Sequence, residues 1–340
     1  MSAPSVHRLP RIPAVPLAIL TGALLGALLI FISGHNPASA YWSILVGALA
    51  PENLPDMLNW AVPLVGMTLV AALPLRGGMV NLGGDGQLVV GGLVAALVPL
   101  YLHAPGPVAA VAAILAAMAA SGLYASLAAW GETRFGVPML ISSLLLSYPA
   151  VGIASYIVGF PLRDTTTGLP ETVMIPRSAR LPMIVDPLNI GLILMAIAAA
   201  LVVFYDRRTV GGYELRMRGL NARFAAYGGV ALNSQTMRIM FISGAIAGLV
   251  GAIIVLGSQY RFQDGALVTP SYTWSGLMAA LLASGEPVGA ISAGVFFAIL
   301  QTGGFAMQRD TAIPRVLTMV LQAIIILFLA IRHGAGRRTP

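Results

Sequence analysis

The chain has 340 residues, of which 58% are hydrophobic and only 9% are charged, and its formal net charge is +7. Soluble domains carry about 25% charged residues, so this composition excludes an ordinary water-facing surface and makes lipid the expected solvent. All 19 basic residues are arginines, and the chain contains no cysteine. The absence of lysine excludes a standard phosphate-binding loop, and the absence of cysteine excludes disulfides and thiol catalysis.

The residues that could support catalysis or bind a metal form no cluster in the sequence. The four histidines are widely separated, and none has a second histidine four residues away, as a helical metal pair requires. The HExxH and GxSxG motifs of metalloproteases and serine hydrolases are absent. We therefore expect no catalytic residue, no metal site, no bound cofactor and no enzymatic activity in this chain.

Apolar runs long enough to cross a bilayer recur along the whole chain. The hydrocarbon core is about 30 Å thick, and a helix that rises about 1.5 Å per residue needs about 20 apolar residues to span it. The runs predict an all-α polytopic membrane protein with about ten transmembrane helices. They cover residues 14–33, 57–75, 80–101, 107–130, 137–160, 187–205, 237–258, 270–284, 287–307 and 313–331.

The arginines indicate which helix ends face the cytoplasm, because cytoplasmic loops are enriched in basic residues. With the N-terminus inside, 13 of the 19 arginines fall on the cytoplasmic side. This orientation predicts cytoplasmic tails at residues 1–13 and 332–340 around a transmembrane domain of residues 14–331. The two longest connections are then a periplasmic loop at 161–186 and an arginine-rich cytoplasmic loop at 206–236.

Two further patterns concern how the helices pack. The second to fifth and the seventh to tenth predicted helices form two sets of four with opposite orientation, the arrangement of an inverted repeat that is common in transporters. The sequence similarity between the two sets is too weak to establish the repeat. Small residues at four-residue spacing, such as Gly244 and Gly248, predict close approach between neighbouring helices.

The segment from Arg76 to Gln87 is the most informative part of the chain. Five glycines between residues 77 and 86 disfavour a regular helix there. An Asp at the centre of a membrane helix costs about 2.5–3.5 kcal/mol, and irregular backbone at membrane depth is tolerated only inside protein or beside a cavity. One interpretation is a broken helix that places Asn81, Asp85 and Gln87 along a substrate path. The other is a cytoplasmic turn capped by Asn81 or Asp85.

A second informative segment, residues 206–230, is basic and interrupted by glycines. Within it, Ala222 to Tyr227 could form a short helix that projects Phe224 and Tyr227. A short helix lying on the cytoplasmic face suits a docking element for a partner protein. The alternative is a basic loop that touches anionic lipid.

The third segment begins at Ser271 with the sequence SYTWSG, and the apolar run that follows is short for a complete span. If this run is a half helix, its start near Trp274 and Ser275 would face the same cavity as residues 81–87. Trp274 could then stack on a base or a sugar. The alternative for Trp274 is an anchor at the membrane interface, where tryptophan is enriched.

These segments resemble the permease subunits of nucleoside and simple-sugar ABC importers, which belong to the superfamily of ribose and branched-chain amino-acid permeases. The resemblance extends from about residue 55 to residue 331. Residues 78–87, GMVNLGGDGQ, are similar to the family signature G-x-x-N-I-G-x-E-G-Q. Three more motifs follow in the family's order: GYELRMRGLN at 212–221, SGAIAGLVG at 243–251, and SGLMAALL at 275–282 followed by PVG at 287–289.

The sequence departs from the family pattern at three places. Asp85 replaces the usual Glu, and Arg223 and Phe224 stand where the cytoplasmic segment commonly has Glu-Ala. Residues 136–141, GVPMLI, lack the polar Asn-Glu pair of the family's G-V-N-E-V-I. The second departure bears on how the partner ATPase docks, and the third on the choice of substrate.

The resemblance implies a bacterial inner-membrane importer that works by alternating access. The expected partners are an ABC ATPase subunit with two nucleotide-binding domains that holds ATP and Mg²⁺, a second permease subunit of the same or a paired kind, a substrate-binding protein and membrane lipid, with no nucleic acid. Residues expected to contact substrate are Asn81, Asp85, Gln87, Trp274 and Ser275. Residues expected to couple to the ATPase are Glu214, Arg216, Arg218, Asn221, Arg223, Phe224 and Tyr227.

Three alternatives remain open at this point. A branched-chain amino-acid permease shares the superfamily, although its motifs fit less well. An ion-coupled secondary transporter would typically need a buried acid–base pair, and Asp85 has no obvious intramembrane partner in the sequence. A membrane-embedded enzyme is disfavoured by the missing catalytic motifs. Nucleosides are the first choice of substrate because of the NLGGDGQ signature, with simple sugars second.

Overall fold

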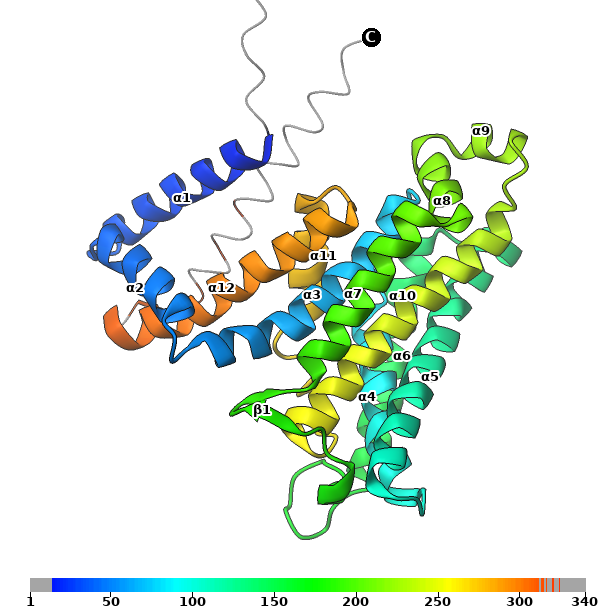
Figure 1. Ribbon diagram of the computed structural model, residues 1–340, viewed down its shortest axis with the longest axis horizontal. Coiled ribbons are helices and arrows are strands. Elements are labelled where there is room, and N and C mark those ends of the chain that lie inside the picture. The colour runs from blue at the N-terminus through cyan, green and yellow to red at the C-terminus, as the bar shows by residue number, and fades with distance from the viewer. Residues whose placement is uncertain (1–13, 312, 315, 317–319, 321–323, 325–340) are drawn as a thin grey trace, which may run out of the picture. The chain divides into compact units, whose positions relative to one another are not determined.

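The computed structural model describes residues 14–311, 313, 314, 316, 320 and 324 (Figure 1). Both predicted tails, 1–13 and 332–340, and most of the predicted span 313–331 therefore lie outside the described residues. The chain divides into two compact units, one formed by residues 1–47 and 303–340 and the other by residues 48–302. The larger unit contains all four of the motifs that resemble the permease family.

In the smaller unit, α1 (Ala14–Ile32) is followed by α2 (Pro37–Leu49) after a bend of 120°. The sequence did not predict α2. Gly34 has a φ of +81° in the turn, and the Asn36 side chain accepts a hydrogen bond of 2.9 Å from the backbone N–H of Ala38. A glycine that adopts positive φ followed by an Asn cap is a local signal for a helix end and a new helix start.

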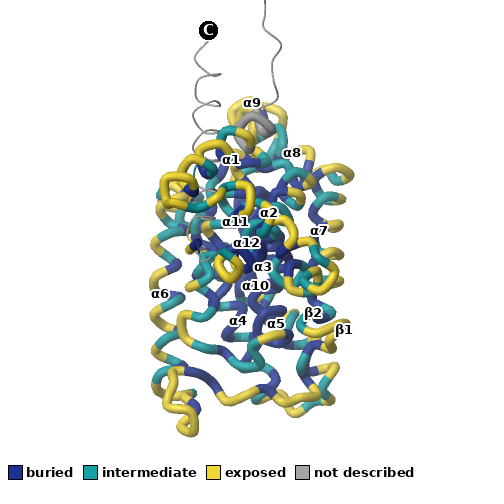
Figure 2. The backbone as a smooth tube through the Cα atoms, turned by 90° about the vertical axis from the view of Figure 1, so that its left-hand side faces the viewer, coloured by how far each residue is buried: buried dark blue, intermediate teal, exposed yellow. Residues whose placement is uncertain are grey.

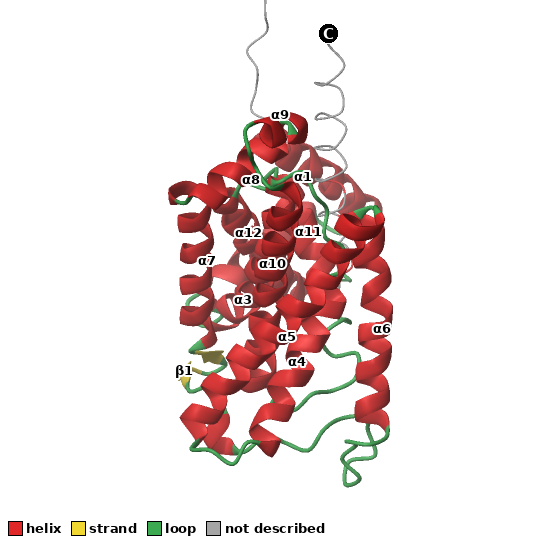
Figure 3. Ribbon diagram, turned by 90° about the vertical axis from the view of Figure 1, so that its right-hand side faces the viewer, coloured by secondary structure: helices red, strands yellow, loops and turns green. Residues whose placement is uncertain are grey.

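The larger unit is a helical bundle with one small β-hairpin (Figure 3). Its elements are α3 (Leu54–Arg76), α4 (Gly84–Tyr101), α5 (Gly106–Phe135), α6 (Met139–Gly159), η1 (Arg177–Ala179), β1 (Met183–Val185), β2 (Leu188–Asn189), α7 (Gly191–Arg208), α8 (Val210–Leu220), α9 (Ala222–Tyr227), α10 (Leu232–Ile254), the π-helical turn η2 (Val255–Gln259), α11 (Tyr272–Leu282) and most of α12 (Pro287–Thr311). The hairpin is antiparallel and pairs Met183 with Asn189. The described residues are mostly helical, as the all-α prediction requires, and the short hairpin of β1 and β2 is a local exception.

The core of this unit is α10, which packs against α3, α4 and α5 (Figure 2). Glycines allow the helix backbones to approach closely. Gly244 faces the backbone of Ser121 and Gly122 on α5, and Gly248 lies between Ala117 on α5 and Gly91 on α4. The predicted role of the small residues at 244 and 248 is confirmed. By contrast, α6 at the outside exposes large apolar side chains such as Leu145 and Ile153, as a helix that faces lipid does.

Six helices in the described part of the chain are long and apolar enough to cross a membrane, or seven if the bent pair α1–α2 counts as one span. The prediction of about ten spans is therefore not confirmed, and neither is the inverted repeat. One reason is α11, which has 11 residues and is too short to cross alone. Another is that most of the tenth predicted span lies outside the described residues.

The predicted loop at 161–186 is held by the segment that follows η2. The backbone N–H groups of Thr172 and Ile175 donate to the carbonyl oxygens of Phe262 and Tyr260, each at 2.9 Å. Glu171 forms an ion pair with Arg261 and accepts a hydrogen bond of 2.7 Å from Gln263. Burial raises the pKa of Glu171, but hydrogen bonds from Gln263 and Thr167 and the positive charge of Arg261 outweigh that effect and lower it overall.

Candidate functional site

The helix break predicted between Arg76 and Gln87 exists and lies deep in the larger unit. The α3 helix ends at Arg76, residues 77–83 are non-helical, and α4 begins at Gly84. Asn81 contacts Ser243, which is 11 residues after Leu232, the first residue of α10. At about 1.5 Å per residue, the break reaches about 16 Å along α10, roughly half the thickness of a bilayer core. The location agrees with a buried break and disagrees with a turn at the membrane surface.

Asn81 is the centre of the polar contacts that hold this break. Its Nδ2 donates to Gln87 Oε1 at 3.1 Å and to Ser243 Oγ at 3.0 Å. Its Oδ1 accepts from the backbone N–H of Gly83 at 2.9 Å and from Gln87 Nε2 at 3.1 Å. Ser243 in turn donates to the carbonyl oxygen of Val70 on α3 at 2.7 Å. Asn81, Gln87 and Ser243 are all buried, so these side chains fix the backbone of the break.

Two serines on α6 complete the hydrogen bonding of the break. Ser143 Oγ accepts from the N–H of Leu82 at 3.0 Å, and Ser147 Oγ accepts from the N–H of Gly86 at 3.4 Å. Buried N–H groups at the start of a helix need such partners, because no earlier helical turn supplies them. The sequence analysis did not identify these serines. Their four-residue spacing within an apolar helix was the available signal.

The α11 helix is a half helix, as the sequence suggested, and its start meets the start of α4. A side chain on Gly84 would collide with Thr273 in the first turn of α11. Gly276 packs against the backbone of Met67 in the middle of α3, whereas Gly285, just after α11, packs against Arg76 at the end of α3. With 11 residues, α11 is about 16 Å long, so it runs from mid-depth to the end of α3.

The junction between α4 and α11 contains polar side chains that make no hydrogen bond to the rest of the bundle. Asp85 and Thr273 interact with each other, and among the described residues Asp85 Oδ1 and Thr273 Oγ1 have no hydrogen-bond partner outside this pair. A negative charge is stabilised near a helix N-terminus, and two N-termini meet here. The helix break does not include Asp85 or Gln87, which lie in the first turn of α4. The junction can therefore accept hydrogen bonds from a polar ligand.

Next to this junction, Trp274 is exposed and Ser275 is half-buried. The ring of Trp60 on α3 lies 5.7 Å from that of Tyr272, so the first turn of α11 is held against α3 by an aromatic pair. The structure thus brings Asp85, Thr273 and the start of α11 together. The polar groups of Asn81 and Gln87, by contrast, are occupied within the chain.

The predicted short helix at residues 222–227 is confirmed with those bounds as α9. Its start is capped by Asn221, whose Oδ1 accepts a hydrogen bond of 3.0 Å from the N–H of Phe224. The preceding helix, α8, is capped in the same way by Thr209. The side chains of Phe224 and Tyr227 are exposed, with relative exposures of 61% and 93%, and Arg223 is exposed as well. Large apolar and aromatic groups of this kind suit contact with a partner.

Two other arginines of the predicted coupling set are turned toward the protein. Arg218 donates to the carbonyl oxygen of Leu232 at 3.0 Å and to Thr236 Oγ1. Burial lowers the pKa of Arg218, and the nearby carboxylate of Glu132 partly opposes this shift. Arg216 forms an ion pair with Asp206 at the end of α7, and Glu214 is half-buried. Arg216 and Arg218 therefore attach α8 to the bundle.

Comparison with known proteins assigns the chain to a family. The family model of branched-chain amino acid transport system / permease components matches residues 53–330. The guanosine ABC transporter permease protein NupP of Bacillus subtilis is 31% identical over 96% of this chain and 94% of its own length. The glucose ABC transporter permease protein TsgB13 of Haloferax volcanii is 28% identical, over 92% of this chain and 85% of its own. The nucleoside ABC transporter permease protein NupB of Lactococcus lactis is 27% identical, over 94% of this chain and 90% of its own.

These matches cover the bundle, the buried helix break and the α8–α9 pair together. They confirm the resemblance to nucleoside and sugar permeases that the four sequence motifs indicated. The apolar helices agree with a membrane protein that crosses the bilayer several times. The chain is thus a multi-pass membrane protein that belongs to the family of branched-chain amino acid transport system / permease components.

Proposed function

We propose that this chain is the transmembrane subunit of an ATP-driven ABC importer for nucleosides. The observation that carries the proposal is the α8–α9 pair, which exposes Phe224 and Tyr227 at one end of a helical bundle that has no lysine for a phosphate-binding loop. An ATP-driven transporter without a phosphate-binding loop of its own needs an ATPase on another chain. The exposed helix offers that chain a place to dock.

In this proposal, the end of the bundle that carries α8 and α9 faces the cytoplasm of a bacterial cell, and both chain termini lie on the same side. The ATPase subunit, which holds ATP and Mg²⁺, contacts Arg223, Phe224 and Tyr227 directly. Glu214, Arg216, Arg218 and Asn221 take part by fixing the position of α8 and α9. The capping and ion-pair contacts of Asn221 and Arg216 support this division.

The proposed substrate path passes the junction of α4 and α11. The oxygens of Asp85 and Thr273 have no partner outside their own pair, and they can accept hydrogen bonds from the ribose hydroxyls or the N–H groups of a base. Trp274 offers an aromatic face beside Ser275, and stacking on an aromatic side chain is a common way to bind a base. Asn81 and Gln87 contribute by holding the break in place. The hydrogen-bonding oxygens and the aromatic face of Trp274 both suit a nucleoside.

Alternating access would use the starts of α4 and of the half helix α11 as moving parts. ATP binding by the partner would displace α8 and α9, and the start of α4 would then open to one side of the membrane or the other. The complete importer would contain two permease subunits, alike or paired, with a binding protein at the end that carries β1 and β2. Discontinuous helices with N-termini near the membrane midplane are a common site of substrate binding in transporters.

A simple sugar is the second candidate, because one of the similar proteins is named as a glucose permease. The aromatic ring of Trp274 separates the two possibilities in part. A purine can stack on it over its whole face, whereas a monosaccharide offers only C–H groups. Replacement of Trp274 by Ala should therefore weaken nucleoside uptake more strongly than sugar uptake.

The test is reconstitution of the chain in vesicles with the ATPase subunit and the binding protein of the proposed importer. We expect ATP-dependent, vanadate-sensitive accumulation of radiolabelled guanosine, with glucose and leucine as competing substrates. Competition by unlabelled nucleosides alone would support the proposal. Accumulation that depends on an ion gradient and continues without ATP would refute it in favour of a secondary transporter.

A further inference from the structure

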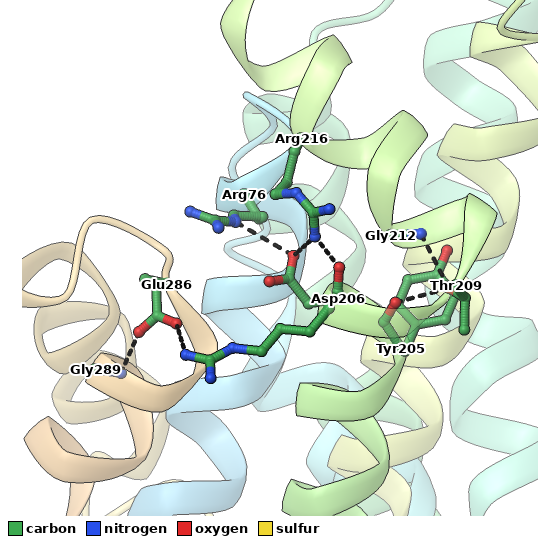
Figure 4. Close-up of polar contacts among 9 residues, drawn as sticks. Arg76, Tyr205, Asp206, Thr209, Gly212, Arg216, Glu286 and Gly289 are labelled. Carbon is green, nitrogen blue, oxygen red and sulfur yellow. Dashed lines mark hydrogen bonds and ion pairs between the residues drawn. The ribbon is translucent and has the colours of Figure 1, made fainter.

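Asp206, at the end of α7, is a buried carboxylate that forms ion pairs with two arginines (Figure 4). It is only 2% exposed, and its carboxylate faces two arginines from other helices. Asp206 Oδ1 lies 3.3 Å from Arg76 Nε and 3.4 Å from an Nη of Arg216. The same Nη of Arg216 also donates to the backbone carbonyl oxygen of Asp206. A buried carboxylate is therefore shared by two guanidinium groups.

The two arginines belong to elements with different tasks in the proposed function. Arg216 lies on α8, the helix that leads directly to the exposed α9. Arg76 is the last residue of α3, and the non-helical break to Asn81 starts one residue later. Asp206 thus connects the docking helices to the beginning of the break through two ion pairs.

A backbone contact reinforces the same connection. Gly219, near the end of α8, packs directly against the carbonyl group of Arg76. If Gly78 carried a side chain, its Cβ would lie 3.7 Å from the Cα of Gly219. Gly285, which follows α11, packs against Arg76 from another direction. The start of the break is therefore held between α8 and the end of α11, and neither contact leaves room for independent movement.

A second ion pair extends the connection to α12. Arg207, next to Asp206, lies 3.2 Å from Glu286, which also accepts a hydrogen bond of 2.5 Å from the N–H of Gly289 at the start of α12 (Figure 4). This pair is more exposed than the Asp206 cluster, with side-chain exposures of 56% and 34%. Exposed pairs contribute little, whereas a buried carboxylate without its partners is strongly unfavourable. The buried ion pairs of Asp206 with Arg76 and Arg216 are therefore the contacts that are most unfavourable to separate.

We propose that Asp206 is the positioning residue that transmits movement of α8 and α9 to the helix break at residues 77–83. This inference rests on the proposed function, since it requires a partner that pushes on α9. If α8 shifts, Arg216 moves Asp206 and Asp206 moves Arg76, because separating any of them leaves a buried charge without a partner. The break then changes position at its start, while the Asn81 contacts hold its deep end.

The test uses the complete reconstituted complex and three readouts: uptake, ATP hydrolysis and accessibility of the break. The main variant is Arg216→Gln, which removes the link between α8 and Asp206 and leaves the Arg76–Asp206 pair in place. Asp206→Asn is the second variant, and it removes both links. Arg134→Gln, an exposed arginine at the end of α5, is the matched control. We expect Arg216→Gln to lower uptake at least tenfold while ATP hydrolysis keeps at least half of its rate.

Accessibility is measured by labelling a single introduced cysteine. The chain has no cysteine of its own, so no other position in this chain is labelled. Val80 is suitable because it lines an open groove of about 420 Å³ between the break and α8. We expect maleimide labelling of Val80→Cys to differ between nucleotide-free and vanadate-trapped complexes. In Val80→Cys combined with Arg216→Gln, the rate should be the same in both states. A purely structural role would lower protein yield without removing this nucleotide dependence.

Each result distinguishes the inference from the proposed function. A wild-type complex without ATP-driven uptake would refute the function itself. Wild-type uptake in both Arg216→Gln and Asp206→Asn would overturn the role of Asp206 and leave the function standing. A parallel loss of uptake and ATP hydrolysis in Arg216→Gln would also overturn it, because Arg216 would then act by docking the ATPase. If Asp206→Asn does not assemble, Arg216→Gln alone decides the outcome.

Discussion

Replacement of Asn81 by Ala should destabilise the protein strongly, because this side chain satisfies several buried groups at once. Without it, the N–H of Gly83 and both polar atoms of the Gln87 side chain lose the partners that they have in the described structure. Ser243 loses one contact and keeps its bond to Val70. A buried group without a partner costs about 1–3 kcal/mol, so these three atoms together give a loss of at least about 3 kcal/mol.

The loss is measurable as a lower thermal midpoint of the purified chain in detergent. A change of 1 kcal/mol shifts the midpoint by about 2–4 °C in a domain of 150–250 residues, and by less in a longer chain. We therefore expect Asn81→Ala to lower the midpoint by about 5–10 °C relative to the wild type. All variants need the same heating rate, because unfolding of a membrane protein is commonly irreversible.

Asn53→Ala is the matched control, since Asn53 precedes α3 and its side chain makes no capping hydrogen bond. Its midpoint should remain within about 1 °C of the wild type. Gln87→Ala should cost less than Asn81→Ala, because Asn81 then keeps its bonds to Gly83 and Ser243. The double variant should cost less than the sum, because the two residues share the same bonds. A small shift for Asn81→Ala, or full additivity with Gln87→Ala, would refute the view that Asn81 holds the break.

Three further predictions follow from other parts of the larger unit. Tyr227→Ala should reduce co-purification of the ATPase subunit at least fivefold without changing the thermal midpoint, whereas Tyr148→Ala, at another exposed tyrosine on α6, should leave co-purification unchanged. Gly219→Ala should abolish ATP-dependent uptake, because the new methyl group would collide with the backbone at the end of α3, while Gly152→Ala meets open space and should transport normally. The lowered pKa of Glu171 implies that its stabilising contribution is complete above about pH 4.5 and is lost as the pH falls through the lower folded value. Glu171→Gln should remove that acid-dependent loss of the thermal midpoint, and an unchanged pH profile would contradict the assignment.

The strongest sequence predictions came from signals that act over a few residues. Glycines and polar residues between two apolar runs predicted the break before α4, since helix propensity and the cost of polar groups in lipid act locally. The bounds of α9 followed from the Asn221 cap and the glycines after Tyr227. The Asn36 cap before α2 was an equally local signal, and it was overlooked because α2 is too short to resemble a span.

Such local signals could not predict the contacts between helices that are far apart in the sequence. In the sequence, Arg216 and Arg218 look like surface charges of a basic loop, but the side chains of both form bonds to other helices. The pairing of Asp206 with Arg76 joins residues that are 130 positions apart. Ser143 and Ser147 had no marked role in the sequence, because the N–H groups that they satisfy belong to another segment.

The sequence alone indicates a helical membrane protein that resembles a family of permeases, an interruption of the helix near Asn81 and a short helix at 222–227. Composition, glycine content and capping residues favour these features because each acts within one or two helical turns. The contacts between helices establish that Asn81 and Gln87 satisfy each other, that the starts of α4 and α11 meet, and that Asp206 joins α8 to the break. Those arrangements depend on which helices pack together, and burial then determines which polar groups find partners and which remain free for a ligand.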